Sequence, residues 1–254
     1  MEFSEICQST LPIKPWMQSK TRRLPGIQPI EAGTWLIRDE TFAQQMAYRD
    51  HLLATRQNEV FRASPESEPA QQELLETVLS ELDTGYQKGR AVMRPDGVLV
   101  PLSGAPILAA ARLVQEDLLL LDMSAEPRLN AAVLCFPASW TLDEKFGAGL
   151  MAIHGDIDEY TDEMAARVRR LFEAVRPEQP LWRANFLRYE SADLFQPRRV
   201  GEEKPAPTEG GFVRVERQTL RKLKRTGAVV FGIHTYVIQW NQLNDAEQIA
   251  FSEA

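Results

Sequence analysis

The chain has 254 residues, of which 44% are hydrophobic and 8% aromatic, and its formal net charge is −7. This composition is sufficient for a folded core, and the negative charge disfavours nucleic acid or an anionic membrane surface as a partner. The two cysteines, Cys7 and Cys135, exclude a four-cysteine zinc or iron–sulfur site within the chain.

The N-terminus lacks a basic region followed by an apolar core, so no secretory signal is predicted. No apolar run reaches the roughly 20 residues that a membrane helix requires. The low cysteine content is typical of a reducing compartment. We therefore expect a soluble, cytoplasmic protein.

The first half of the chain predicts an arm followed by helices. Residues 1–38 are rich in proline and glycine and are expected to lie over a domain as an extended arm. Asp39 is predicted to cap a helix reaching about Gln57. A second helix is expected to begin at Pro69, with an apolar stripe that continues to Tyr86.

The middle of the chain predicts short strands. Asp96-Gly97 between two apolar segments indicates a β-hairpin, and a short helix is expected over 105–114. Residues 118–121 and 131–136 are expected to form strands. Thr141 is predicted to begin a short helix with acidic residues in its first turn.

The last third of the chain predicts one more helix and then strands. Thr161 is expected to open the helix, and 181–189 is predicted as a strand. A polar loop follows at 196–211. Residues 212–217 alternate as in a half-buried strand, and 228–240 is the longest β-like run. Because helices come first, strands dominate the end and no βαβ repeat occurs, we expect an α+β fold.

Histidines are the first candidates for chemistry. His154 follows an apolar approach and precedes a run of acidic residues, so it can be a metal or haem ligand or a satisfied structural side chain. His51 is expected to be solvated. His234 lies among apolar residues of a predicted strand, and Gly232 beside it would let a ligand approach closely.

Other motifs are weaker. The segment 147–152 matches a GxGxxA fingerprint but lacks the strand–turn–helix context, so nucleotide binding is not expected there. Arg183 and the segment 214–217 place cations on apolar strands. Such side chains either alternate out to solvent or bind an anion, such as a carboxylate, in a pocket.

Several segments together resemble one family. They are Phe136-Pro137-Ala138-Ser139-Trp140, Glu144-Lys145-Phe146-Gly147, Ile153-His154 with Tyr160, Trp182-Arg183-Ala184-Asn185-Phe186, the stretch 215–220 followed by 226–231, and Thr235-Tyr236. In this order, within a span from about Trp35 to Trp240, they resemble the haem-dependent oxidative N-demethylase α-subunit family.

This resemblance implies a PAS-like fold, in which an antiparallel sheet flanked by helices binds haem b. The predicted division is an extended N-terminal arm, 1–38, and a single haem-binding domain, 39–254. The implied reaction is oxidation of a small secondary amine, such as dimethylamine, with O2 and release of an aldehyde. Electrons would come from NADPH through a separate reductase subunit that carries flavin and a 2Fe–2S centre.

The resemblance also implies site residues. His154 would be the proximal iron ligand, with a second nitrogen free to donate a hydrogen bond. Further predicted haem-binding residues are Lys145, Arg183 and Tyr160. The predicted catalytic residues are Glu216, Arg217 and His234. Which of Arg183, Glu216, Arg217 and His234 would line the distal pocket, and which would anchor propionates, stays open.

The sequence departs from the family pattern at several places, among them Phe186, where the family favours tryptophan. Asp156 and Asp158 stand where the family has prolines, and His234 stands where it has an arginine. Two alternatives therefore accompany the enzyme hypothesis. The chain could be a haem-binding sensor or carrier without turnover, or a haem-free binding or structural module.

Overall fold

A computed structural model provides the fold and describes residues 6–22, 26–149, 169–203 and 210–254. The predictions for His154, for Tyr160 and for the beginning of the helix at Thr161 lie outside these described residues.

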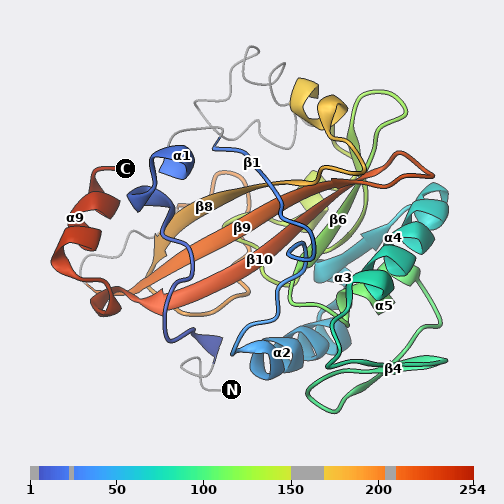
Figure 1. The fold of residues 1–254 in the computed structure, drawn as a ribbon, viewed down its shortest axis with the longest axis horizontal. Helices are drawn as coiled ribbons and strands as arrows, with labels where there is room; N and C mark the ends of the chain where they lie inside the picture. The colour runs from blue at the N-terminus through green and yellow to red at the C-terminus, as the bar shows by residue number, and fades with distance from the viewer. Residues whose placement is uncertain (1–5, 23–25, 150–168, 204–209) are drawn as a thin grey trace.

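A seven-stranded sheet organises the chain (Figure 1), with every pairing antiparallel. Its order is β1 (Gln28–Pro29), β8 (Leu181–Tyr189), β9 (Phe212–Lys222), β10 (Val229–Gln239), β6 (Asp117–Asp122), β7 (Arg128–Val133) and β2 (Phe61–Ala63). The expected α+β class is confirmed. The predicted strand over 181–189 is confirmed to the residue, and β9 continues through the basic stretch after Arg217.

The helices are short and come mainly from the first half of the chain. They are α1 (Ser19–Arg22), α2 (Phe42–Thr55), α3 (Gln57–Val60), α4 (Glu68–Glu81), α5 (Pro106–Ala111), α6 (Leu142–Lys145) and α9 (Asp245–Ser252). Residues 169–174 are also helical. Three 3₁₀ turns lie at Pro15–Met17, Pro65–Ser67 and Trp240–Gln242. Within the described part of the chain, no helix has the length and apolar character to cross a bilayer.

Two helix boundaries differ from the prediction. Asp39 is not the N-cap of α2. Thr41 is, and Asp39 Oδ1 instead accepts hydrogen bonds from the Thr41 N–H and hydroxyl. The second helix ends at Glu81, before Tyr86. Tyr86 still packs edge-on against Phe42, which explains its place in the apolar pattern.

The predicted hairpin is confirmed in a separate three-stranded sheet. It is formed by β3 (Gln87–Lys88), β4 (Ala91–Met93) and β5 (Leu99–Pro101). Gly97 in the turn has a φ of 83°, a left-handed conformation that suits glycine.

The pairing register divides the large sheet into two faces, because facing residues share a side and successive residues alternate. We call the first the arm face. It carries Ala184, Arg217 and His234, which lie in register across β8, β9 and β10. Trp16 of the N-terminal segment packs in the apolar cluster of this face with Ala184, and the ring of Trp35 lies 4.5 Å from the guanidinium of Arg221. In Figure 1 this segment runs across the central strands.

We call the opposite side the corner face, because the segment 136–141, termed the corner, packs on it. It carries Asn185 and Glu216, which pair in register, and Arg183 and Gln218 in the next row. Two smaller apolar clusters cover it. One includes Leu142 and Ile233, and the other joins the helical segment 169–174 to the sheet through Phe172.

A buried ion pair fixes the chain as it enters the corner. Arg49 Nη1 of α2 lies 2.8 Å from Asp117 Oδ1 of β6, and both side chains have no exposed area. Arg49 also donates to the Gln115 carbonyl at 2.6 Å. The Asp117 carboxylate accepts from the backbone N–H groups of Cys135 and Phe136 at 2.9 and 2.8 Å. One carboxylate therefore ties α2, β6 and the start of the corner together.

The substitution Asp117→Ala is expected to lower the free energy of unfolding by about 3–5 kcal/mol, because it leaves Arg49 charged and buried without its partner. Urea unfolding measures this. The control is Asp143→Ala, which breaks an exposed ion pair with Arg62 and should cost less than about 1 kcal/mol. Equal losses for the two variants would contradict the central position of Asp117.

Candidate functional site

The corner is held on the sheet in a strained conformation. Ser139 has a φ of 64°, and among the described residues it is the one non-glycine with positive φ. Its N–H donates to the Gln196 carbonyl at 3.0 Å, and its hydroxyl lies 3.0 Å from the Tyr189 hydroxyl of β8. Such backbone persists only where surrounding contacts over-determine it. The corner is therefore built to keep one shape.

Arg214 of β9 supplies the strongest of these contacts. Its side chain is 1% exposed and donates from Nη1 to the Leu194 carbonyl at 3.0 Å. Nη2 donates to the Phe136 carbonyl at the start of the corner. The same guanidinium forms an ion pair with Glu216, with Nη2 3.0 Å from Oε1. Because a guanidinium carries five N–H donors in one plane, Arg214 can hold the corner and orient Glu216 at once.

Glu216 is thereby fixed on the corner face. It is buried, Oε1 accepts from Arg214, and Oε2 accepts from the Gln218 side chain at 3.1 Å. Asn185 of β8 faces Glu216 across the strand pair. A carboxylate, two amides and a guanidinium thus form one polar row on this face.

Arg183 extends the polar row and has donor capacity to spare. It faces Gln218 in register and is half-buried, and its Nε is buried with no hydrogen-bond partner among the described residues. Burial lowers the pKa of the guanidinium, and the charge of Glu216 opposes this effect. A buried donor without a partner is costly, so an anionic group bound here would be stabilised.

Apolar side chains lie on the same face. Phe231 is half-buried and packs against both apolar clusters of the corner face, while Trp140 packs against one and Leu181 against the other. Half-buried aromatic and aliphatic groups beside a cation suit a flat, apolar ligand that carries a carboxylate. The corner face is therefore the candidate functional site.

The segment 145–149, which comes after the corner and begins at the last residue of α6, precedes residues 150–168. Lys145 at the end of α6 is 6% exposed. Gly147 follows with a φ of 74° and donates to the Leu129 carbonyl, and Gly149 forms an isolated β-bridge with Arg128. His154 and Tyr160 lie beyond, outside the described residues, and their roles stay predictions.

The other two predicted catalytic residues lie on the arm face, across the sheet from Glu216 and Arg183. His234 has no exposed side-chain area and sits between two carboxylates, with Nδ1 3.2 Å from Glu116 Oε1 and Nε2 3.3 Å from Asp39 Oδ2. Arg217 donates to the carbonyls of Thr34 and Trp35 at 2.7 and 3.0 Å. The structure thus separates the predicted residues into two groups.

The electrostatics around His234 favour its charged form. Burial disfavours the imidazolium, but hydrogen bonds and charges from Asp39 and Glu116 outweigh it and raise the pKa of His234 to about 9. Burial likewise disfavours a charged Asp39, yet hydrogen bonds from His234, Gln115 and Gln8 keep the pKa of this carboxyl below its usual range. His234 therefore bridges the start of α2 and β6 as a cation.

Sequence reasoning missed Arg214, Asp39 and Glu116 as partners of the predicted residues. The signal that could have found Arg214 is the alternation of Arg214, Glu216 and Gln218 with Val215 and Arg217, which a strand must place on opposite faces. Asp39 and Glu116 are far from His234 in the sequence, and no local pattern joins them.

Two comparisons bear on the site. The family model described as haem-dependent oxidative N-demethylase, alpha subunit-like, matches residues 26–252. No curated protein matches the chain. Among the described residues no three His, Cys, Asp or Glu side chains form a metal-binding cluster. A haem iron takes one axial side chain from the protein and needs no such cluster.

The stability supplied by His234 is expected to depend on pH. Its folded-state pKa is raised from the ordinary value of 6.5 to about 9. The contribution is therefore fully present below pH 6.5 and lost as pH rises through 9. In urea unfolding, wild type should exceed His234→Gln in stability at pH 7, and this excess should shrink by roughly 3 kcal/mol by pH 10.

The comparison between the two proteins cancels titrations that they share, such as those of tyrosines. A stability difference that stays constant from pH 7 to pH 10 would contradict a charged His234.

Proposed function

Because the chain belongs to the haem-dependent oxidative N-demethylase, alpha subunit-like family, we propose that it binds haem b on the corner face and oxidises a small secondary amine. The proposal includes a PAS-like fold for the sheet and its flanking helices. It also retains the sequence-based expectation of a cytoplasmic protein that uses O2 and releases an aldehyde.

One observation carries the proposal. The segments that resemble the family, although far apart in the sequence, meet on the corner face: the corner itself, the strand with Arg183 and the strand with Glu216. Arg183 offers a buried donor, Nε, that has no partner in the described part of the chain, and it shares this face with the half-buried Phe231 and Leu181. These groups fit the carboxylates and the apolar plane of a porphyrin.

His154 is the proposed protein ligand of the iron, since a neutral imidazole is the usual proximal ligand of b-type haem. The chain enters its segment at Gly149, beside β7. Arg183, with Lys145 near the end of α6, is the proposed propionate anchor. Tyr160 is proposed to lie against the cofactor. Haem, when bound, supplies the chemistry of O2 and of one-electron transfer.

Glu216 is the proposed polar group on the substrate side. A small secondary amine is a cation near neutral pH, and a carboxylate with a fixed orientation can hold it at a defined place. Arg214 and Gln218 provide that orientation, because each bonds one carboxylate oxygen of Glu216. Asn185 beside it can accept a further amine hydrogen bond.

For Arg217 and His234 the contacts support a positioning role. Arg217 holds two carbonyls of the arm, and His234 joins Asp39 to Glu116 behind the same strands. We propose that they keep β9 and β10 in place, so that Glu216 on the opposite face stays aligned.

The family name describes an alpha subunit, and the proposed partner is a reductase subunit with flavin and a 2Fe–2S centre that passes on electrons from NADPH. A second candidate is haem binding without turnover, as in a sensor or carrier. The environment of His234 favours this second candidate. His234 stands where the family has an arginine, and both of its ring nitrogens are bound to carboxylates of the chain. Formaldehyde formed from dimethylamine by dithionite-reduced protein in O2 would support the enzyme.

The substitution His154→Ala is expected to abolish the Soret band that the wild type gains on haem reconstitution, because it removes the proposed iron ligand. An absorption spectrum after removal of unbound haem measures this. His51→Ala is the matched control, since His51 is exposed on α2, and it should keep the wild-type spectrum. Equal haem content in both variants would overturn the assignment of His154.

The substitution Arg183→Gln is expected to speed haem loss by about 10-fold, the effect of one lost charge-assisted hydrogen bond. The rate of haem transfer to excess apomyoglobin measures this. Arg188→Gln is the control, because Arg188 lies on the same strand but on the arm face, where it stacks over Trp240 at 4.1 Å. Haem loss that responds to Arg188 and not to Arg183 would place the cofactor elsewhere.

A further inference from the structure

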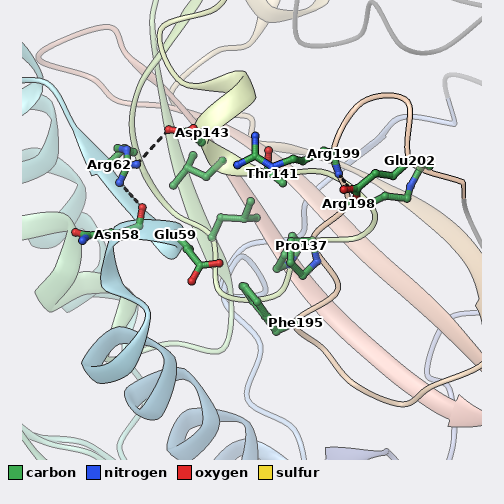
Figure 2. Close-up of a pocket in the computed structure, with 13 residues that line it drawn as sticks. Asn58, Glu59, Arg62, Pro137, Thr141, Asp143, Phe195, Arg198, Arg199 and Glu202 are labelled. Carbon is green, nitrogen blue, oxygen red and sulfur yellow. Dashed lines mark hydrogen bonds and ion pairs between the residues drawn. The ribbon is translucent and has the colours of Figure 1, made fainter.

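A pocket lies beside the corner, whose Pro137 and Thr141 form part of its lining. It has a volume of about 390 Å³ and lies between α3, β2, α6 and the loop 195–202. This volume is within the range of roughly 300–1,000 Å³ that small-molecule sites occupy. Figure 2 shows Arg62 and Asp143 on one side of it and Arg198, Arg199 and Glu202 on the other. The proposed haem site does not use these residues.

Apolar side chains line part of the pocket, and charged ones surround them. Leu134, Leu142, Pro137 and Phe195 are the apolar lining. The guanidinium of Arg56 lies over the ring of Phe195, 4.4 Å from the ring centroid. The pocket therefore offers a ligand both apolar contacts and charged groups.

Protein donors already occupy the carboxylates around the pocket. Glu59 accepts two bonds from Arg56, at 2.8 and 2.9 Å. Asp143 pairs with Arg62 at 3.1 Å, and Glu202 accepts from the Arg199 N–H at 2.9 Å. Glu144, just behind, accepts from Thr141 and from the Val200 N–H. Each of these acids therefore already shares its charge with a donor of the protein.

Within the described part of the chain, Arg198 and Arg199 make fewer hydrogen bonds to the protein than their N–H groups allow. Arg198 donates from Nη1 to the Glu202 carbonyl, but its Nε is buried without a hydrogen-bond partner among the described residues. Arg199 adds a second, exposed guanidinium from the next position. Two neighbouring guanidinium groups present planar donors that match a carboxylate.

We propose that this pocket binds a small organic carboxylate with a flat apolar body. Arg198 and Arg199 hold the carboxylate, and the body lies against Leu142 and Phe195. Since Leu142 also packs in an apolar cluster of the corner face, the ligand sits directly behind a wall of the proposed haem site.

Isothermal titration of the full chain with benzoate tests this proposal. Benzoate is expected to bind at one site, benzylamine not to bind, and inorganic phosphate to bind at least about 10-fold more weakly because it lacks the apolar body. Arg198→Gln should weaken benzoate binding by about 10-fold. The control Arg225→Gln, which changes an exposed arginine at the β9–β10 turn, should leave it unchanged.

If Arg198→Gln does not fold, Arg199→Gln serves in its place, because that side chain is exposed. Absence of benzoate binding to the wild type would overturn the proposal. So would benzoate binding that Arg183→Gln abolishes and Arg198→Gln leaves intact, since the carboxylate would then occupy the corner face. Haem binding is measured separately, so the two proposals can fail independently.

Discussion

The contacts of Arg214 are the constraint on which the candidate site depends. One buried guanidinium holds the Phe136 carbonyl, the Leu194 carbonyl and the Glu216 carboxylate. The cost of burying this charge is offset by an ion pair and several charge-assisted hydrogen bonds. As a result, the corner, the loop after β8 and the polar row of β9 form a single rigid group. The long central strands give that group a fixed base.

Much of this arrangement follows from the sequence. The long strands were predictable because their apolar residues are continuous or alternate, and the hairpin at Gly97 because its turn chemistry is specific. The family resemblance is confirmed by a match over residues 26–252. The two-residue period of a strand also separates Glu216 from Arg217, although the two were predicted to act together.

Other features depend on contacts that no local pattern carries. The sequence predicts that His234 lines a pocket. Only the folded chain brings Asp39 and Glu116 to either side of it. The sequence predicts that the N-terminal arm only lies over the domain. In the structure Ile6, Trp16 and Trp35 are buried in its apolar clusters. The pocket beside the corner joins segments near residues 60, 140 and 198, which only the complete fold brings together.

The two faces of the sheet thus differ in how their polar side chains are bound, although both faces belong to the same strands. On the arm face, His234 and Arg217 neutralise or bind groups of the chain itself, and no capacity is left for a ligand at His234. On the corner face, Arg183 Nε has no hydrogen-bond partner among the residues that the structure describes, and the ring of Phe231 is half-buried. A protein tolerates unsatisfied buried polarity where a ligand completes it. The arm side also has buried polar atoms without a partner among the described residues, such as Glu116 Oε2 and Trp35 Nε1. The two faces therefore differ in the kind of group left over: on the corner face it is a cation beside half-buried apolar side chains, which is why this face is the candidate site.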